Sequence, residues 1–305
     1  MSDGTGQIIV VAGATGDLGG RVVAALVRRG AEVRALVRAG TAQTKIEHLR
    51  EGGALPVLVD FDETNALQAA CQGASCVVST LNGLAPIMLE LQGRVLDAAV
   101  AAGVPRFMPS DFSLDFTRTR PGDNRNLDLR RQFAEVADKA PIKVQSVLNG
   151  MFMELLPHDA RVILPKQHRV FHWGDPDQLL DLTTKDDVAD FVADVALDPE
   201  APRWSRIAGS SVSMRQIGEI MSRVTGERYR LLRPGGIRAF GVVINVVKTL
   251  SPKSDDPFPA WQGMQYMRDM LSGSGKLDPL DNGRYGKSDW TTAEMLLTQA
   301  FGGKQ

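Results

Sequence analysis

The sequence lacks the features that mark a membrane protein, a secreted protein or a nucleic-acid-binding protein. Its apolar runs, such as FGVVINVV at residues 240–247, are too short to span a bilayer. The N-terminus, MSDGTGQ, has no basic or long apolar region, so we expect no secretory signal and a cytoplasmic location. The 35 basic and 36 acidic side chains leave a net charge of −1, which favours neither nucleic acid nor a membrane as a partner.

Metal-binding and nucleophile motifs are also scarce. The sequence has no GxSxG elbow, no Walker-type lysine and no CxxC zinc pattern. Cys71 and Cys76 are expected to be reduced thiols, a redox pair being the less favoured alternative. In HRVFH, His168 and His172 would share one face of a strand, with Asp175 near. A metal site needs further ligands at better spacing, so we predict none.

What the chain does have is a regular alternation of elements in its first half. Short apolar runs such as QIIVVAG and AEVRALVR each precede a segment with helical periodicity. Strands that alternate with helices predict a Rossmann-type doubly wound α/β fold with a parallel sheet. The pattern becomes irregular near Met151. We therefore predict a dinucleotide-binding domain at residues 1–155 and a smaller substrate-side domain at 156–305, parts of which pack back on the sheet.

The stretch VVAGATGDLGGRV, residues 10–22, places three glycines between the first predicted strand and helix. Gly13 would allow a sharp turn, Gly16 a close approach of the backbone to a pyrophosphate, and Gly19 close packing of helix on strand. The start of the helix would offer free N–H groups and a positive dipole end. The pattern predicts a nucleotide site, the alternative being only a tight strand–helix turn.

The end of the second predicted strand indicates which dinucleotide binds. An acidic residue there would bind the ribose 2′-hydroxyl of NAD and repel a 2′-phosphate. This strand instead ends in Arg38, and Lys45 follows in the next helix. A guanidinium pairs with a phosphate through two hydrogen bonds, so we predict NADP(H). The alternative is that Arg38 is a solvated charge at a strand end.

Four segments carry a resemblance to a known family: VAGATGDLGGRV, VRALVR, RFMPSDF and VLNGMF. They resemble the NmrA-like atypical short-chain dehydrogenases, whose plant relatives include isoflavone and phenylcoumaran benzylic ether reductases. By this resemblance, Thr15, Gly16, Asp17 and Leu18 would line the pyrophosphate of NADP(H), and Arg38 would bind its 2′-phosphate. Asp60 and Phe61 would lie beside the adenine. Thr80 and Leu81 would contact the nicotinamide ribose, and Ser110 and Asn149 the nicotinamide. The resemblance also implies that Met151 and Phe152 begin the substrate pocket.

The catalytic group is where the match to the family fails. The three tyrosines, Tyr229, Tyr266 and Tyr285, have no lysine four residues later, which excludes the YxxxK chemistry of other short-chain dehydrogenases. The lysine of the plant reductases would fall near Asn126 or Arg131, and neither is lysine. In a reductase built this way, Arg130 or Arg131 would polarise the acceptor, while Ser110, Asp111 or a water relays the proton. The alternative places both arginines on the solvated face of a helix.

The second half favours an aromatic or lipophilic small molecule as the substrate. Methionines and aromatic residues suggest an apolar cleft, although most of them would equally suit a core: Met151, Met153, Met264, Met267, Met270, Phe152, Phe258 and Trp261. We expect the HRVFH strand to border the pocket, so that His172 or Trp173 contacts substrate. Two functions stay open, an NADPH-dependent reductase and a catalytically silent NAD(P) sensor with a protein partner. A homodimer is also left open.

Overall fold

A parallel six-stranded sheet forms the first half of the computed structural model, which describes residues 2–252 and 254–303. Its strand order is β3-β2-β1-β4-β5-β6, and the order reverses between β1 and β4. The strands are β1 (Ile8–Ala12), β2 (Glu32–Val37), β3 (Leu55–Leu58), β4 (Cys76–Ser79), β5 (Arg106–Met108) and β6 (Lys143–Val144). The predicted Rossmann-type α/β fold is confirmed. Ligands of such sheets bind beyond the carboxyl ends of the strands, where the order reverses.

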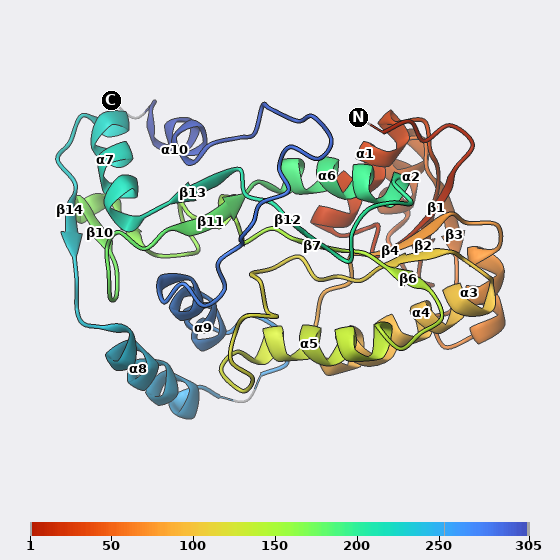
Figure 1. The fold of residues 1–305 in the computed structure, drawn as a ribbon, viewed down its shortest axis with the longest axis horizontal. Coiled ribbons are helices and arrows are strands. Elements are labelled where there is room, and N and C mark those ends of the chain that lie inside the picture. Colours follow the sequence, from red (N-terminus) through yellow and green to blue (C-terminus); the bar gives the residue numbers. More distant parts are fainter. Residues whose placement is uncertain (1, 253, 304–305) are drawn as a thin grey trace.

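Helices cover both faces of this sheet (Figure 1). One core joins the sheet to α1 (Asp17–Arg28) and α6 (Lys185–Leu197), and a second core joins it to α3, α4 and α5. The remaining bounds are α2 (Gln43–Glu51), α3 (Thr64–Cys71), α4 (Gln92–Ala101) and α5 (Arg125–Ala137). Directly before α4 lies a π-helical segment, η1 (Pro86–Leu91), and the chain becomes α-helical at Gln92. Such π segments are frequent at functional sites.

From residue 146 onward, the end of the first half and the second half form short strands in three small sheets. The pairings are β14-β10-β9, β13-β11-β8 and β12-β7. The strands are β7 (Ser146–Leu148), β8 (Met151–Phe152), β9 (Ile163–Leu164), β10 (Arg169–Phe171), β11 (Leu180–Thr183), β12 (Trp204–Arg206), β13 (Ser210–Val212) and β14 (Arg230–Leu232). The helical segments are η2 (Met153–Leu155), η3 (Pro165–Gln167), α7 (Met214–Thr225), α8 (Ile237–Leu250), α9 (Ala260–Leu271) and α10 (Ala293–Phe301).

Helix α6 shows that the second half packs back on the sheet, as expected. A side chain caps the start of this helix, since the Thr184 hydroxyl accepts a hydrogen bond from the Asp187 N–H. Its apolar side chains join the core of the first half beside α1. The buried guanidinium of Arg29 in the α1–β2 turn pairs with Asp194 of α6 at 2.9 Å. Elements from both sides of residue 155 therefore share one core, and the domain boundary itself stays a prediction.

Two further sequence expectations concern the cysteines and the membrane. Cys71 and Cys76 are both free and buried, and burial raises the pKa of each thiol to about 11. Both are therefore protonated at neutral pH and unreactive. Within the described residues, no helix combines the length and the apolar character needed to cross a membrane.

Candidate active site

The glycine loop between β1 and α1 is tightly folded. Gly13 has a φ of +87°, and a Cβ on it would lie 2.7 Å from Thr80 Oγ1. A Cβ on Gly19 would lie 2.1 Å from the Gly13 carbonyl oxygen. Gly16 is exposed, and it caps α1 without a side-chain hydrogen bond. The first N–H groups of α1 are thus open to a ligand, and the cradle fits the pyrophosphate of a dinucleotide.

Charged side chains surround this loop. The Asp17 carboxylate is bound by Lys185 at 2.5 Å and by Arg21 at 2.9 Å, and these two hydrogen bonds lower its pKa. Asp17 therefore offers a ligand its backbone N–H, while its charge is balanced. Lys45 Nζ lies 3.5 Å from the Thr15 carbonyl oxygen, so a second cation stands close to the loop.

Arg38 lies directly after β2, with an exposed side chain. Within the described ranges, no carboxylate oxygen lies within 4.0 Å of its guanidinium. An exposed guanidinium without a partner is suited to a 2′-phosphate. The adjoining strand β3 is followed by Asp60, which is exposed, and by Phe61, which is buried. Both residues lie after β3 at the edge of the sheet, and their place beside the adenine stays a prediction.

The carboxyl ends of β4 and β5 are joined by Gln92. Its side-chain oxygen accepts hydrogen bonds from Ser79 Oγ at 2.7 Å and from the Ser110 N–H at 2.9 Å. Thr80 Oγ1 donates to the Ala12 carbonyl oxygen at the end of β1, and Leu81 is half-buried beside it. The structure thus brings the predicted residues Gly13, Thr80 and Ser110 to one edge of the sheet.

Asn149 follows β7 and is fully buried. Its N–H donates to the Ser113 carbonyl oxygen at 3.0 Å, so it lies against the segment that follows β5. Neither polar atom of its side chain has a hydrogen-bond partner in the part of the chain that the structure describes. A buried amide without partners is costly, and such groups in proteins usually receive a ligand or a water.

Asp111, the next residue after Ser110, is buried among polar groups. Its Oδ2 accepts a hydrogen bond from Ser146 Oγ at 2.7 Å, and Ser146 Oγ also accepts one from Arg203 at 2.6 Å. Burial raises the pKa of Asp111 to about 6, and the hydrogen bond from Ser146 and the charges of Arg203 and Arg130 oppose that rise. Its carboxyl group can therefore hold or release a proton near neutral pH.

The two arginines on α5 have different surroundings. Arg131 donates to Asp128 and to the Phe116 carbonyl oxygen, both at 2.5 Å, and to Thr119, so it anchors the loop before α5. Arg130 is 7% exposed, and its Nε has no partner in the described residues. Its Nη1 donates to the Asn126 carbonyl oxygen and approaches the Tyr266 hydroxyl. Neither side chain is on a solvated face, so that alternative was wrong.

The predicted substrate contacts lie in two separate places. Met151 and Phe152 form β8, are half-buried, and pack against different cores, which places them where the two cores meet. His172 and Trp173 follow β10, which lies near the opposite end of the molecule from β1 (Figure 1). Trp173 stacks on Phe240 of α8, with ring centroids 4.8 Å apart. The structure thus separates these two residues from the glycine loop.

The expected histidine pair does not share a strand face. His168 precedes β10 with a φ of +48° and is exposed, whereas His172 is buried. Burial lowers the pKa of His172, and the charges of Arg233 and Arg215 act in the same direction. Of the candidate cleft residues, Met153, Met267, Met270 and Trp261 are buried in the core, while Phe258 is 47% exposed. For these four buried residues the core interpretation is confirmed.

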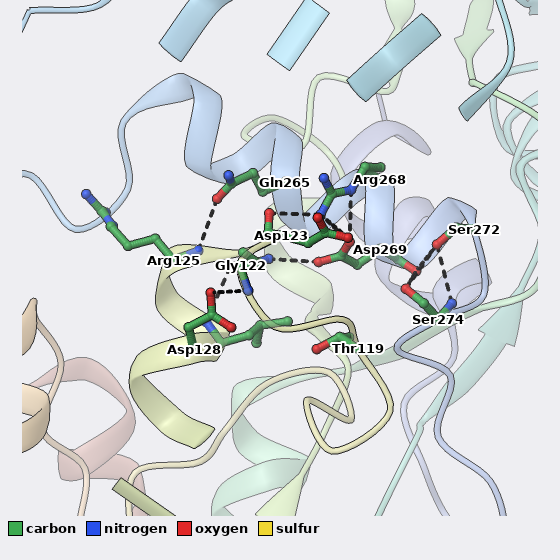
Figure 2. Close-up of polar contacts among 12 residues, drawn as sticks. Thr119, Gly122, Asp123, Arg125, Asp128, Gln265, Arg268, Asp269, Ser272 and Ser274 are labelled. Atoms are coloured by element: carbon green, nitrogen blue, oxygen red, sulfur yellow. Dashed lines mark hydrogen bonds and ion pairs between the residues drawn. The ribbon is translucent and has the colours of Figure 1, made fainter. Parts of the chain in front are cut away.

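Sequence reasoning missed a polar junction between the start of α5 and α9 (Figure 2). The buried carboxylate of Asp269 accepts hydrogen bonds from Asn124 Nδ2 at 3.1 Å and from Arg268 at 2.7 Å. Gln265 Oε1 accepts a hydrogen bond from the Arg125 N–H. Burial raises the pKa of Asp269, which Arg268 and Asn124 oppose. The signal in the sequence was the polar series Gln262, Gln265 and Asp269, spaced along one face of an otherwise apolar segment.

Comparisons with known proteins agree with this fold. The model of the NmrA-like family matches residues 5–281. An isoflavone reductase homolog from Zea mays is 28% identical over 238 residues, 73% of this chain and 75% of the relative. A structure of AtPrR2 with NADP+ and (+)-pinoresinol superposes with a TM-score of 0.82 at 20% identity, over 97% of this chain and 99% of the other. A structure of the leucoanthocyanidin reductase–NADPH complex from Vitis vinifera superposes with a TM-score of 0.80 at 16% identity, over 96% of this chain and 99% of the other. The chain belongs to the NmrA-like family.

Proposed function

We propose that the protein is a cytoplasmic NADPH-dependent reductase that transfers hydride to a small aromatic acceptor. The observation that carries the proposal is the buried, unpartnered amide of Asn149 behind the carboxyl edge of the sheet, because it calls for a polar ligand at the place where a nicotinamide is expected. The relatives support the class, since similar structures hold NADP+ with pinoresinol, or NADPH.

In this proposal NADPH, when bound, supplies the hydride. The N–H groups at the start of α1, including those of Asp17 and Leu18, bind the pyrophosphate, and Thr15 and Gly16 line it. Arg38 binds the 2′-phosphate, and Lys45 adds positive charge nearby. The other proposed contacts are Asp60 and Phe61 to the adenine, Thr80 and Leu81 to the nicotinamide ribose, and Ser110 and Asn149 to the nicotinamide.

The acceptor is proposed to contact Met151 and Phe152, whose half-buried apolar side chains suit an aromatic ring. His172 and Trp173 would take part only for an acceptor that extends toward β10. Arg130 polarises the acceptor, a role for which it is better suited than Arg131, because the Arg131 guanidinium is already bound by loop oxygens. Ser110, Asp111 or a water relays the proton, and the pKa of about 6 at Asp111 suits that task.

The cofactor assignment is tested by calorimetric titration with NADPH, NADP+, NADH and NAD+ at one salt concentration. We expect NADPH to bind most tightly. Arg38→Glu should weaken NADPH binding by about 10- to 100-fold, because it removes charge-assisted hydrogen bonds, and should change NADH binding little. Arg50→Glu, an exposed position at the end of α2, is the matched control. Equal losses for NADPH and NADH would contradict the assignment of Arg38.

A second candidate function is a catalytically silent NAD(P) sensor that acts through a protein partner. It is favoured by one observation, the absence of lysine at Asn126 and Arg131. A sensor requires clearly different affinities for oxidised and reduced cofactor, since equal binding shifts no equilibrium. A reductase requires NADPH oxidation with an acceptor, for which pinoresinol and an isoflavone are the first probes. Turnover with either would decide for the enzyme.

A further inference from the structure

Helix α9 brings a tyrosine to the polar end of α5. Tyr266 is half-buried against the core of the second half. Its hydroxyl oxygen lies 3.4 Å from Nη1 of Arg130, which is 136 residues away in the sequence. Burial raises the pKa of Tyr266, while the charge of Arg130 and a hydrogen bond with the Asn126 side chain oppose the rise. The phenol is therefore protonated at neutral pH and has a cation beside it.

Arg130 is a buried cation without a counter-ion. No carboxylate oxygen lies within 4.0 Å of its guanidinium in residues 2–252 and 254–303, and its buried Nε has no hydrogen-bond partner. Its charge nevertheless acts on Asp111, directly after β5, as well as on Tyr266. Arg130 thus lies within electrostatic reach of both the carboxyl edge of the sheet and α9. An uncompensated buried cation is costly, and such groups gather at functional sites.

The polar junction between α5 and α9 fixes the position of Tyr266. Figure 2 shows Asp269, Gln265 and Arg268 of α9 facing the loop that leads into α5. Gln262 Nε2 adds a hydrogen bond to Asn124 Oδ1 at 2.7 Å, and Arg268 donates to the Asp123 carbonyl oxygen at 2.9 Å. Residues on both sides of Tyr266 along α9 are therefore held on α5, so the phenol has a fixed place beside Arg130.

The two places where the family resemblance puts a lysine cannot supply a proton. Asn126 has no titratable group, and its Nδ2 donates to the Pro257 carbonyl oxygen at 2.9 Å. Arg131 stays charged and is bound by the loop before α5. Tyr266, from helix α9, has a titratable hydroxyl that lies beside the Arg130 guanidinium of α5.

We propose that Tyr266 is the proton donor of the reductase reaction and that Arg130 stabilises the phenolate that remains. The inference rests on the proposed function. Hydride addition leaves an electron pair, and a negative charge, on the acceptor. The O–H bond of Tyr266 breaks, its proton bonds to that acceptor atom, and the O–H electron pair stays on the phenolate oxygen. The proton relay of the proposed function, Ser110, Asp111 or a water, then returns a proton to the phenolate. The cation lowers the energy of the charged product of this transfer.

Kinetics with NADPH and pinoresinol or an isoflavone provide the first test. Tyr266→Phe should lower kcat by about 10²- to 10⁴-fold with KM changed less than about threefold, since it removes a proton donor and leaves the ring in place. Tyr229→Phe, at a buried tyrosine of the same core, is the matched control and should keep kcat. NADPH affinity by calorimetry should be unchanged in both variants. Arg130→Lys should keep more of kcat than Arg130→Gln.

A second readout needs neither cofactor nor acceptor. The chain has only three tyrosines, so phenolate absorbance measured against pH in the unaltered protein and in Tyr266→Phe isolates the titration of Tyr266. Arg130→Gln should raise the pKa of Tyr266, because the phenolate loses its cation, and Arg130→Lys should raise it less.

The outcomes separate the two claims. No NADPH oxidation by the unaltered protein with any acceptor overturns the reductase proposal together with this inference. Turnover that survives Tyr266→Phe with kcat intact overturns the role of Tyr266 alone. A Tyr266 titration that does not respond to Arg130→Gln overturns the tyrosine–arginine pair, and loss of kcat together with lost NADPH binding reduces Tyr266 to a structural residue.

Discussion

At the residue scale, two adjacent glycines in the first turn of α1 differ in how closely other backbone atoms approach them. Gly19 faces the Gly13 carbonyl oxygen, where a Cβ would approach to 2.1 Å, whereas a Cβ on Gly20 would find its nearest neighbour, the Ala14 carbonyl oxygen, at 3.6 Å. The sequence pattern identified Gly19 as the packing glycine. It could not show how close the two backbones come, because that depends on the position of α1 against β1.

This contrast predicts different effects of a single methyl group. Gly19→Ala should destabilise the protein by about 1–3 kcal/mol, because backbone must move to admit the Cβ, and should abolish measurable NADPH binding. Gly20→Ala should leave stability equal or raise it by up to about 1 kcal/mol, since alanine is the better helix former. Urea unfolding and calorimetry measure both effects. Similar stability of the two variants would show that the loop adapts more freely than its geometry indicates.

Other residue-scale predictions succeeded or failed according to sequence separation. Gly13, Thr80 and Ser110 met at one edge because strand order places the ends of β1, β4 and β5 side by side. The contact between Arg130 and Tyr266 could not be predicted, because no local sequence pattern connects two residues that lie 136 positions apart on different helices. The sequence has no YxxxK motif, in which the tyrosine and its cation lie on one helix. In the folded chain, however, a cation from a different helix lies beside a tyrosine.

At the element scale, helices with strong periodicity were predictable and elements fixed by partners were not. The segments that became α1 and α7 have apolar residues at helical spacing, and Thr184 followed by two aspartates marks the start of α6. IKVQSVLNG, by contrast, reads as one strand but splits into β6, paired with β5, and β7, paired with β12. The segment splits because β7 pairs with β12, which comes from the second half of the chain. A local sequence pattern cannot predict a pairing with a strand so far away in the sequence.

The start of α5 gives a prediction at this scale. Asn124 caps α5 by accepting the Leu127 N–H, and it also bonds Asp269 and Gln262 of α9. Asn124→Ala should cost about 2–4 kcal/mol, because a cap is lost and a buried carboxylate loses a donor. Thr292→Ala, at the exposed cap of α10, should cost about 1 kcal/mol, since only the cap is lost.

Urea unfolding of the two cap variants measures the difference, with the m-value showing whether the transition keeps its cooperativity. Equal losses of stability would mean that the bonds from Asn124 to α9 contribute nothing beyond a helix cap. The α5–α9 junction would then not be what holds Tyr266 in place.

At the scale of the whole molecule, buried polar groups link the two halves. Asp111 comes from the segment after β5, and Arg203 precedes β12 in the second half, with Ser146 Oγ bonded to both. Composition and periodicity predicted two domains, because strands and helices alternate only in the first half. They could not show that β12 pairs with β7 or that α6 packs against the first sheet, since both depend on long-range contacts.

Asp111 makes the stability of the whole fold depend on pH in a defined direction. Its pKa is raised by burial to about 6 from 3.8, so between these values the folded chain binds more protons than the unfolded chain. The contribution of Asp111 to stability therefore falls as pH rises through this window, by on the order of 2–3 kcal/mol in total. Well below pH 3.8 the carboxyl group is protonated in both states and the contribution no longer changes.

Asp111→Asn removes this titration while it keeps the shape of the side chain. The unfolding free energy of the variant minus that of the unaltered protein should rise from about pH 4 to about pH 6.5 by the same 2–3 kcal/mol. The free-energy cost of burying the asparagine amide does not depend on pH, so it does not affect how this difference changes with pH. Asp97→Asn, at an exposed position on α4, should give a flat difference. A flat or falling curve for Asp111→Asn would mean that Ser146 and Arg203 stabilise the carboxylate more than burial destabilises it, and Asp111 would then be too strong an acid to relay a proton near neutral pH.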